Sequence, residues 1–283
     1  MGWFLAHGGD GAMINDIFGA MYEASDCHQG NEQQVSGYDV SISDSLYKEE
    51  YFAFSGSAVA AGTDVGTYAM GLKAEQFKNT NPNFENVVFN VTDGELKIDP
   101  LKVTVTITGH SDEKVYNGAA QKVEGYGISV SSPLYKESDF SFSGSAVVEK
   151  TNVGTYPMGL EVSQFTNNNK NFDVTFVVND GQLKITPVEG VTVTITGHKD
   201  SVTYNGNEQQ VKGYDVSINH PLYTEADFSF NGNDVASGIN VGKYPMGLRE
   251  GDFVNNNPNF ADVTFVKCWR TVQIWFALHT ART

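Results

Sequence analysis

The chain has 283 residues, of which 34 are acidic and 18 are basic, so its formal net charge is −16. A surface of this charge repels polyphosphate, and we therefore expect neither nucleic acid nor an anionic membrane as a partner. No run of eighteen apolar residues occurs, so we also expect no membrane insertion. Residues 1–26 lack the basic start of a signal peptide, and we expect any export signal to lie outside this chain.

The most regular feature of the sequence is a unit that recurs at a step of 88 residues. Tyr38, Tyr126 and Tyr214 mark this step, and each of them follows a glycine. Self-similarity at a fixed period indicates an array, and this unit is long enough to hold its own core. The period predicts a non-repeat segment 1–26, copy 1 at 27–99, copy 2 at 100–187, copy 3 at 188–267 and a non-repeat tail 268–283.

Copy 2 is the only copy that the pattern predicts to be complete. Its apolar residues alternate with polar ones in short runs that end at Gly, Asn or Pro, which is typical of half-buried strands. The strands expected in chain order are 103–108, 123–130, 140–143, 146–148, 154–159, 172–178 and 182–186. We expect the last two to form a hairpin around Asn179-Asp180-Gly181, one helical turn at 136–139 and a short helix at 160–165.

This pattern predicts a mainly β chain, a tandem array of small β-rich modules with a short helix in each. Both a β-grasp-like module and an Ig-like sandwich use strands of these lengths, and the sequence leaves the two open. The links between copies contain proline and only three or four residues, so we expect successive copies to have restricted relative motion.

The two ends depart from the repeat. Copy 1 is expected to lack its first strand, and apolar residues at helical spacing predict an amphipathic helix at 12–24 in its place. Such a helix would cover the sheet edge that a missing strand leaves open. Copy 3 is expected to lack its last hairpin, although Val272, Ile274 and Phe276 have the spacing of a substitute strand.

Cysteines occur only near these ends, at Cys27 and Cys268. Copy 2 has none, so the module is expected to fold without a disulfide. Cys27 lies next to the place of Tyr116 and Tyr204 in the other copies, and we interpret it as sequence decay and not as a functional thiol.

A search for reactive groups gives little. His110 and His198 follow Ile-Thr-Gly in copies 2 and 3, without metal-ligand spacing around them, and are expected to be polar turn residues. The carboxylates that come nearest to a calcium site are those of Glu137, Asp139, Glu225 and Asp227, but no acidic cluster recurs in all copies. We therefore expect no metal, no other cofactor, no catalytic residue and no enzymatic activity.

Aromatic residues recur in most copies, and two roles are open to them. The phenylalanines are expected to be core, because most of them alternate with polar residues or precede turns. Tyr135 lies in a Pro-Leu-Tyr turn, with Tyr47 and Tyr223 at the matching positions. These three tyrosines are the aromatic residues we expect to be exposed, and they are the candidate ligand-binding residues.

The order of motifs in copy 2 resembles the MBG-type tandem repeats of bacterial cell-surface proteins, especially those of Gram-positive gut bacteria. The matching motifs are Val115-Tyr-Asn-Gly118, Gly125-Tyr126, Val153-Gly-Thr-Tyr156, Asn171-Phe172 and Asp180-Gly-Gln-Leu-Lys-Ile-Thr-Pro187. The resemblance covers about residues 27–267. It implies an extracellular, secreted or cell-wall-attached protein with an adhesin or stalk role and no enzymatic activity.

Two functions from different classes follow. The first is an elongated stalk or spacer that contributes to adhesion through reach and avidity. The second is a glycan- or mucin-binding module with a weak site in each copy, near the Asn-rich loop 167–169 and Tyr135. Host glycan, mucin or extracellular matrix are the partners that the resemblance implies.

Overall fold

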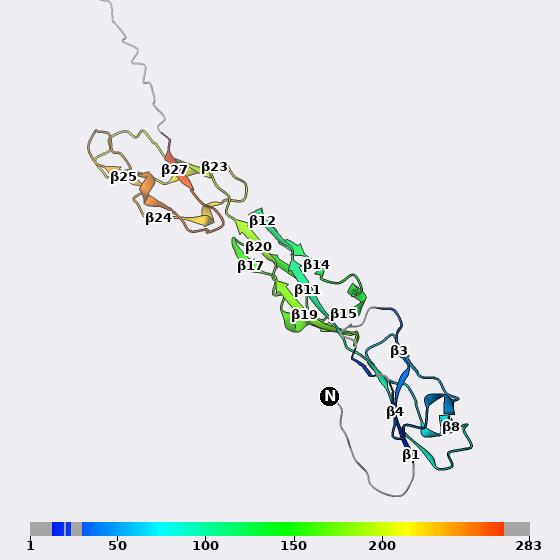
Figure 1. Cartoon of the computed structure of the whole chain (residues 1–283). Coiled ribbons are helices and arrows are strands. Elements are labelled where there is room, and N and C mark those ends of the chain that lie inside the picture. The colour runs from blue at the N-terminus through cyan, green and yellow to red at the C-terminus, as the bar shows by residue number, and fades with distance from the viewer. Residues whose placement is uncertain (1–12, 20, 24–29, 269–283) are drawn as a thin grey trace, which may run out of the picture. The chain divides into compact units, whose positions relative to one another are not determined.

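A computed structural model describes residues 13–19, 21–23 and 30–268 of the chain (Figure 1). The chain divides into two compact units. Unit 1 holds the described residues up to Thr108, together with Gly127–Gly144 and Leu160–Asn179. Unit 2 holds Gly109–Tyr126, Ser145–Gly159 and the described residues from Asp180 onward. Copy 1 thus lies in unit 1, copy 3 lies in unit 2, and copy 2 contributes to both.

Copy 1 consists of short strands in four small sheets. Two sheets have three strands, in the orders β4-β1-β9 and β2-β10-β7, and two are pairs, β3-β6 and β5-β8. The strands are β1 (Met13–Gly19), β2 (Met21–Glu23), β3 (Gln33–Ser36), β4 (Tyr38–Ile42), β5 (Phe52–Phe54), β6 (Val59–Gly62), β7 (Gly66–Ala69), β8 (Phe77–Asn79), β9 (Val87–Thr92) and β10 (Glu95–Ile98).

The helix expected at 12–24 is wrong, and so is the missing first strand of copy 1. Residues 13–19 form β1, in which Ile17 lies opposite Val40 of the antiparallel β4 and Val91 of the parallel β9. Ile17 is fully buried and the next residue, Phe18, is half exposed, as in a strand. Apolar residues at helical spacing form a strand here because two flanking strands supply its hydrogen bonds and its core.

The part of copy 2 in unit 1 repeats this arrangement. Its sheets are β14-β11-β19 and β15-β18, and β11 pairs with β19 in parallel. The strands are β11 (Leu101–Gly109), β14 (Tyr126–Val130), β15 (Phe140–Phe142), β18 (Phe165–Asn167) and β19 (Phe172–Asn179). Val103, Val105 and Ile107 of β11 are buried, so the alternation expected at 103–108 is confirmed.

Unit 2 contains the remaining strands of copy 2 and those of copy 3. Its sheets are β12-β20-β17, β13-β16, β23-β21-β27, β22-β25 and β24-β26. The strands of copy 2 are β12 (Ser111–Val115), β13 (Gln121–Glu124), β16 (Val147–Lys150), β17 (Gly154–Pro157) and β20 (Gln182–Thr186). Those of copy 3 are β21 (Thr192–Gly197), β22 (Gln209–Lys212), β23 (Tyr214–Ile218), β24 (Phe228–Phe230), β25 (Val235–Gly238), β26 (Phe253–Asn255) and β27 (Thr264–Lys267).

The hairpin expected around Asp180-Gly181 is wrong as well. β20 pairs in parallel with β12 and antiparallel with β17, and not with β19. The Asp180 carboxylate accepts a hydrogen bond from the Gly159 amide at 2.9 Å. A Cβ on Gly181 would lie 2.2 Å from the His110 carbonyl oxygen. The Asp-Gly pair therefore serves a close backbone approach within unit 2 instead of a tight hairpin turn.

Helical structure in the described residues is limited to single 3₁₀ turns, two in each copy. They are η1 (Glu49–Tyr51), η2 (Ala74–Gln76), η3 (Glu137–Asp139), η4 (Val162–Gln164), η5 (Glu225–Asp227) and η6 (Glu250–Asp252). The helical turn expected at 136–139 is η3, whereas the short helix expected at 160–165 is only the single 3₁₀ turn η4, and Phe165 already begins β18. The β-rich tandem array is confirmed, and its strand pairing is mixed, with parallel neighbours in each copy.

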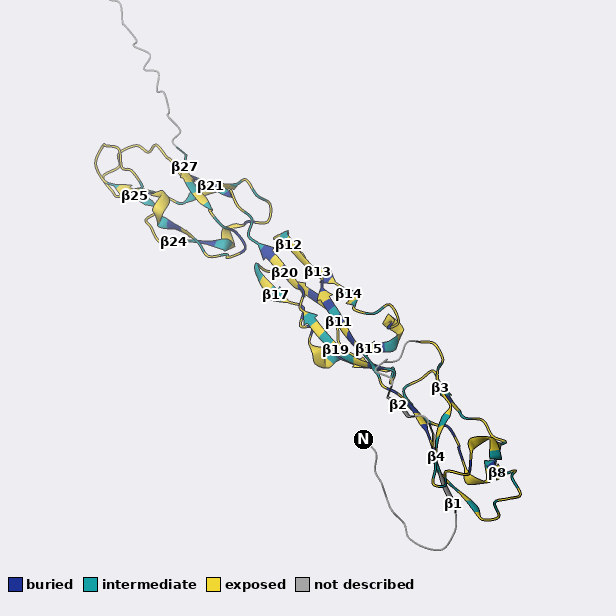
Figure 2. Cartoon of the chain, viewed as in Figure 1, coloured by how far each residue is buried: buried dark blue, intermediate teal, exposed yellow. Residues whose placement is uncertain are grey.

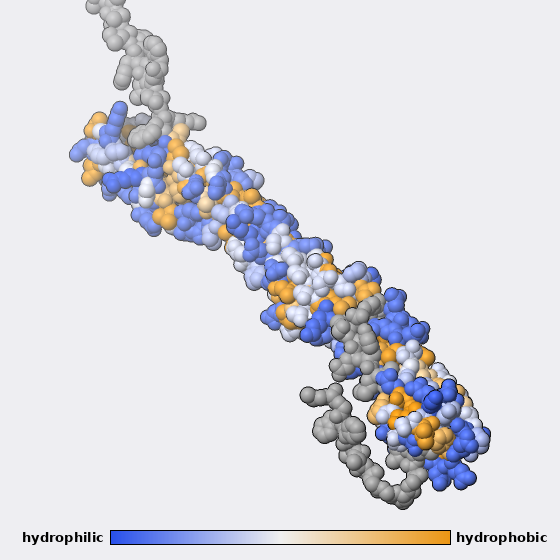
Figure 3. All heavy atoms as spheres, in the orientation of Figure 1, coloured by the Kyte–Doolittle hydropathy of each residue, from blue (hydrophilic) through white to orange (hydrophobic). Residues whose placement is uncertain are grey.

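Buried residues lie along the strands of each copy (Figure 2), and aromatic rings are prominent among them. In copy 2 the ring centroid of Phe140 lies 5.6 Å from that of Phe176 and 6.1 Å from that of Phe165. Phe140, Phe165 and Phe172 are buried, so their expected core role is confirmed. On the face shown in Figure 3, hydrophilic side chains cover most of the surface and apolar ones form small patches. No helix in the described part of the chain has the length and hydropathy to cross a membrane.

Candidate interface between repeat copies

The three tyrosines expected to be exposed are buried. Tyr47, Tyr135 and Tyr223 each expose 2% of their surface, so the expectation that they present a face to a ligand is wrong. The ring of Tyr135 packs against Phe172 with a centroid distance of 5.1 Å, and Tyr223 packs in the same way on Phe260 at 5.0 Å. The Pro-Leu-Tyr turn directs the tyrosine inward, which the sequence around it does not reveal.

Each of these tyrosines uses its hydroxyl group to position an asparagine. The Tyr135 hydroxyl donates to Asn167 Oδ1 or the Asp139 carbonyl, at 3.0 and 3.2 Å, and Tyr47 and Tyr223 have equivalent contacts. Burial, together with the charge of Asp139, raises the pKa of Tyr135 to about 12. A buried hydroxyl with acceptor partners is a structural element, because leaving those partners unpaired would be costly.

The positioned asparagine begins a ladder of asparagines at every second residue. Asn167 Nδ2 donates to the carbonyls of Asn169 and Phe172, and Asn167 Oδ1 accepts from the Asn169 amide. Asn169 Oδ1 accepts in turn from the Asn171 amide at 3.0 Å. Asparagine side chains commonly replace backbone partners in such turns. The Asn-rich loop is thus held in one conformation by its own side chains.

A carboxylate from the neighbouring 3₁₀ turn completes the loop. Asp139 accepts from the Lys136 amide at 2.7 Å and from Asn169 Nδ2 at 3.0 Å. Asp227 has the same partners in copy 3, Thr224 and Asn257. Burial alone would raise the pKa of Asp227, but hydrogen bonds from Asn257 and Thr224 outweigh it and hold the pKa below its usual range.

The last asparagine of the ladder reaches into the preceding copy. Asn171 Oδ1 accepts from the Val65 amide at 2.8 Å, and Asn171 Nδ2 donates to Asp64 Oδ1 at 2.8 Å. The Asn171 carbonyl accepts from the amide of Leu101, the first residue of β11, at 3.0 Å. All four residues belong to unit 1. Asn171 therefore binds a loop of copy 1 with its side chain and the start of copy 2 with its backbone carbonyl.

The same contact recurs one copy later, within unit 2. Asn259 Oδ1 accepts from the Val153 amide at 2.8 Å, Nδ2 donates to Asn152 Oδ1 at 3.2 Å, and the carbonyl accepts from the Val188 amide at 3.0 Å. Asn259 exposes 8% of its surface and is one of the few buried polar residues. We call each of these two contacts an asparagine clamp. The first clamp joins Asn171 to Asp64-Val65, and the second joins Asn259 to Asn152-Val153.

Apolar contacts accompany the clamps. The ring of Tyr116 in copy 2 packs on Phe260 of copy 3, with 5.6 Å between centroids. A Cβ on Gly118 would lie 3.2 Å from Leu222 Cδ2. Leu222 is 40% exposed, whereas Leu46 at the matching position of copy 1 is 72% exposed. The leucine that meets the preceding copy is therefore less exposed in copy 3 than its equivalent in copy 1.

Sequence reasoning did not find this interface. The Asn-rich loop was visible as a repeated feature, and it suggested a glycan pocket, yet its last asparagine contacts a loop about 106 residues earlier in the chain. The available signal was the joint repetition of Asn171 with Asp64-Val65 and of Asn259 with Asn152-Val153.

His110 and His198 directly follow β11 and β21 and lie outside the strands. His110 Nδ1 lies 2.8 Å from the Glu124 carbonyl, and His198 Nδ1 lies 2.8 Å from that of Lys212. His198 also contacts Asp215 at 3.2 Å. Hydrogen bonding to the Lys212 backbone, followed by that to Asp215, raises the pKa of His198.

Across the described residues, no three His, Cys, Asp or Glu side chains form a group that could hold a metal ion. Cys27 and the spacing Val272, Ile274 and Phe276 lie outside the described residues.

Comparison with known proteins places copy 2 in a family. The family model of the MBG domain matches residues 103–187, and MBG domains are repeat domains of surface proteins. No curated protein and no solved structure matches the chain. The match covers the strands from β11 to β20, including the Asn-rich loop and the Asp-Gly pair. Residues 103–187, nearly all of the middle copy of the repeat, are therefore similar to the MBG domain family.

Proposed function

We propose that this chain is a non-enzymatic, extracellular repeat region of a bacterial surface protein, in which successive copies form a stalk that contributes to adhesion. Its mechanism is mechanical: each copy adds length, and a fixed joint between copies preserves that length. The MBG match of copy 2 supports the surface location, because MBG domains are repeat domains of surface proteins.

The observation that carries the proposal is the repetition of the asparagine clamp. A linker of three or four residues alone permits some rotation between domains. Each clamp adds two side-chain hydrogen bonds across the joint, and the backbone carbonyl of the clamp asparagine holds the beginning of its own copy through a third hydrogen bond. A binding module needs no such joint in each copy, whereas a spacer depends on it.

The surface and the core agree with this function. The net charge of −16 favours solubility and mutual repulsion of neighbouring stalks. The tyrosines that a lectin-like site would use for stacking on sugar are buried and hydrogen-bonded to the loop of the clamp. We therefore favour the spacer over a glycan site at these tyrosines.

The test measures how tightly the joint fixes two copies. Spin labels at Ser57→Cys in copy 1 and at the exposed Ser163→Cys in copy 2, both within unit 1 and with the native cysteines replaced by serine, give a distance distribution by pulsed electron paramagnetic resonance. We expect a narrow distribution for the parent chain and a broad one for Asn171→Ala. Asn83→Ala is the matched control, because Asn83 occupies the same ladder position in copy 1.

A broad distribution in the parent chain would refute the stalk. Adhesion is tested separately, by binding of the chain to mucin, extracellular matrix and a glycan array. Saturable binding that survives Asn171→Ala would assign adhesion to the copies themselves, whereas absence of binding would leave the chain as a spacer alone.

A further inference from the structure

A second tyrosine recurs in each copy, just after the loop that receives the clamp asparagine. Tyr68, Tyr156 and Tyr244 stand at the repeat step of 88 residues. Tyr68 belongs to β7 and Tyr156 to β17, the strands that begin directly after Asp64-Val65 and Asn152-Val153. These tyrosines are distinct from the buried ones that position the asparagine ladder, and they lie on the other side of the joint.

The hydroxyl group of each of these tyrosines donates to a carbonyl of the loop. The Tyr68 hydroxyl oxygen lies 2.8 Å from the Asp64 carbonyl oxygen. In copy 3 the Tyr244 hydroxyl oxygen lies 3.0 Å from the carbonyl oxygen at the matching position, Asn240. The Tyr156 hydroxyl has two acceptors within reach, the carbonyl of Asn152 at 3.1 Å and that of Val153 at 3.2 Å. The contact therefore recurs in all three copies.

The ring of this tyrosine packs on the strand that precedes the loop. A Cβ on Gly62 would lie 2.3 Å from Tyr68 Cε2, and a Cβ on Gly238 would lie 2.3 Å from Tyr244 Cε2. Copy 2 has Lys150 at the matching position, and its Nζ lies 5.5 Å from the centroid of the Tyr156 ring. A phenylalanine would keep these ring contacts and lose only the hydrogen bond to the loop.

The carbonyl that accepts from the tyrosine and the amide that donates to the clamp asparagine belong to one peptide group. In copy 1 this is the group of Asp64-Val65, whose amide donates to Asn171 Oδ1 at 2.8 Å. In copy 2 it is the group of Asn152-Val153, whose amide donates to Asn259 Oδ1 at 2.8 Å. A trans peptide is planar, so a partner that fixes its C=O also fixes the direction of its N–H. Hydrogen bonds in such a chain also polarise one another.

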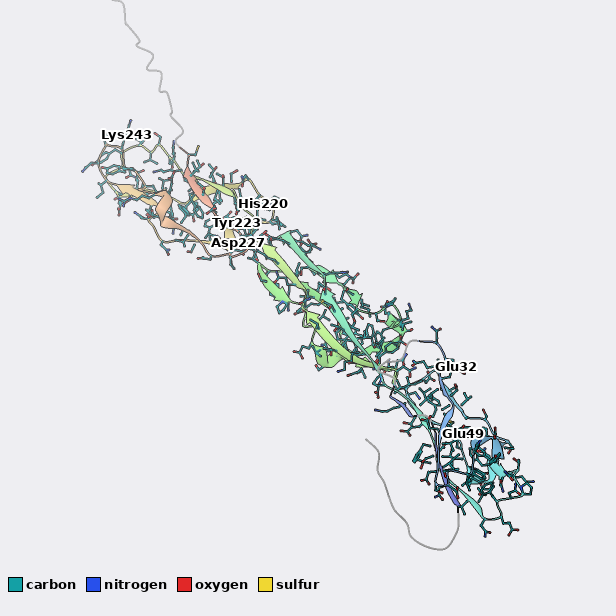
Figure 4. The ribbon with its side chains drawn as sticks, viewed as in Figure 1. Glu32, Glu49, His220, Tyr223, Asp227 and Lys243 are labelled. Atoms are coloured by element: carbon teal, nitrogen blue, oxygen red, sulfur yellow. The ribbon has the colours of Figure 1, made fainter. Side chains whose placement is uncertain are left out.

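Copy 3 shows that the loop and the ladder lie at opposite ends of a copy. In Figure 4 Tyr223 and Asp227, which hold the ladder, lie at one end of copy 3. Lys243, which directly precedes Tyr244, lies at the opposite end. One tyrosine thus orders the surface that meets the preceding copy, and the other holds the loop at the far end.

We propose that Tyr68 and Tyr156 are positioning residues of the asparagine clamps. Each hydroxyl orients the peptide group whose amide binds the asparagine of the next copy, so that two side chains, one from each copy, hold one peptide group between them. This role deepens the proposed stalk and rests on it, because it concerns the joint that fixes successive copies.

The experiment measures hydrogen exchange at single amides of the full chain, by mass spectrometry with fragmentation that resolves individual residues. Tyr68→Phe keeps the ring and removes the hydroxyl. We expect it to accelerate exchange at the Val65 amide by about fivefold, the effect of one net hydrogen bond, and to leave the Val153 amide unchanged. Tyr156→Phe should do the reverse, so each variant is the matched control for the other.

A double substitution separates positioning of the clamp from support of the loop alone. Asn171→Ala removes the acceptor of the Val65 amide. Adding Tyr68→Phe to this variant should accelerate exchange at Val65 by at most about twofold more, because the two side chains act through one hydrogen-bond chain.

Two outcomes overturn the proposal. One is unchanged exchange at Val65 in Tyr68→Phe. The other is an effect of Tyr68→Phe that is as large in Asn171→Ala as in the parent chain, which would show that the hydroxyl stabilises only the loop of its own copy. A broad distance distribution in the parent chain would instead refute the stalk, so the two failures are distinguishable.

Discussion

The asparagine clamp between copies 2 and 3 gives the sharpest prediction about stability. Replacing Asn259 by alanine removes the acceptor of the Val153 amide and the donor to Asn152, which lie at 2.8 and 3.2 Å. The backbone of residue 259 keeps its own hydrogen bonds, from the amide to Asn257 and from Val188 to the carbonyl. The change therefore isolates the side-chain contacts of the joint.

The size of the effect follows from the number and burial of these bonds. Each contributes about 0.5–1.5 kcal/mol net, and the half-buried Val153 amide is left without its partner. We expect Asn259→Ala to weaken the joint by about 2 kcal/mol, which is roughly a 30-fold change in the opening equilibrium.

Hydrogen exchange with mass spectrometry of the full chain is the assay, because it resolves the copies by peptide and needs no two-state assumption. Exchange at the Val153 amide should accelerate by roughly 30-fold in Asn259→Ala, at unchanged rates at Val188, whose hydrogen bond is retained, and in the core strand β21. Asn83→Ala, at the exposed equivalent in copy 1, should have no such effect. Equal acceleration of exchange in Asn259→Ala and Asn83→Ala would refute the reasoning. It would show that the asparagine side chain stabilises only the loop of its own copy and not the joint between copies.

Three further predictions concern the interior of the copies and one histidine. Tyr135→Ala should destabilise copy 2 by about 3–5 kcal/mol in the same exchange assay, and unchanged protection of copy 2 would contradict the buried position of this residue. In the parent chain the pKa of Tyr135 is raised to about 12, so the stabilisation by its neutral phenol should be lost as pH rises from 10 through 12. Absorbance of tyrosinate measures this titration. Gly181→Ala should cost about 3 kcal/mol, because its Cβ would lie 2.2 Å from the His110 carbonyl oxygen, and a neutral effect on the urea midpoint would disprove that close approach. The raised pKa of His198 means that its charged form is favoured by the fold, so its contribution is complete below about 6.5 and disappears as pH rises through the folded value. Asp215→Asn should lower that pKa in an NMR titration, and an unchanged value would remove Asp215 as a cause.

The sequence predicted the parts of the fold that depend on local pattern. Alternation in Val103–Thr108 predicted a strand with three buried residues, and β11 has them. The periodic phenylalanines predicted an aromatic core, because side chains at alternate positions of a strand share one face. Both 3₁₀ turns of copy 2 fell where helical turns were expected.

The failures share a cause, which is that pairing partners are remote in the sequence. Residues 13–19 have helical spacing, but β4 and β9 supply backbone partners that make them a strand. Asp180-Gly181 has the chemistry of a hairpin turn, but β12 and β17 compete for β20 and pair with it. Tyr135 looks exposed in its turn, and its burial depends on Asn167 and Phe172, more than thirty residues later.

The sequence by itself therefore determined the repeat, its β class, its acidic surface and the MBG resemblance, because composition and short-range alternation encode these directly. The tertiary structure alone decided which asparagine joins two copies and which tyrosines are buried. Each of these depends on contacts between residues about 30 to 106 positions apart, and side-chain pattern along a chain does not specify which distant backbone will meet it.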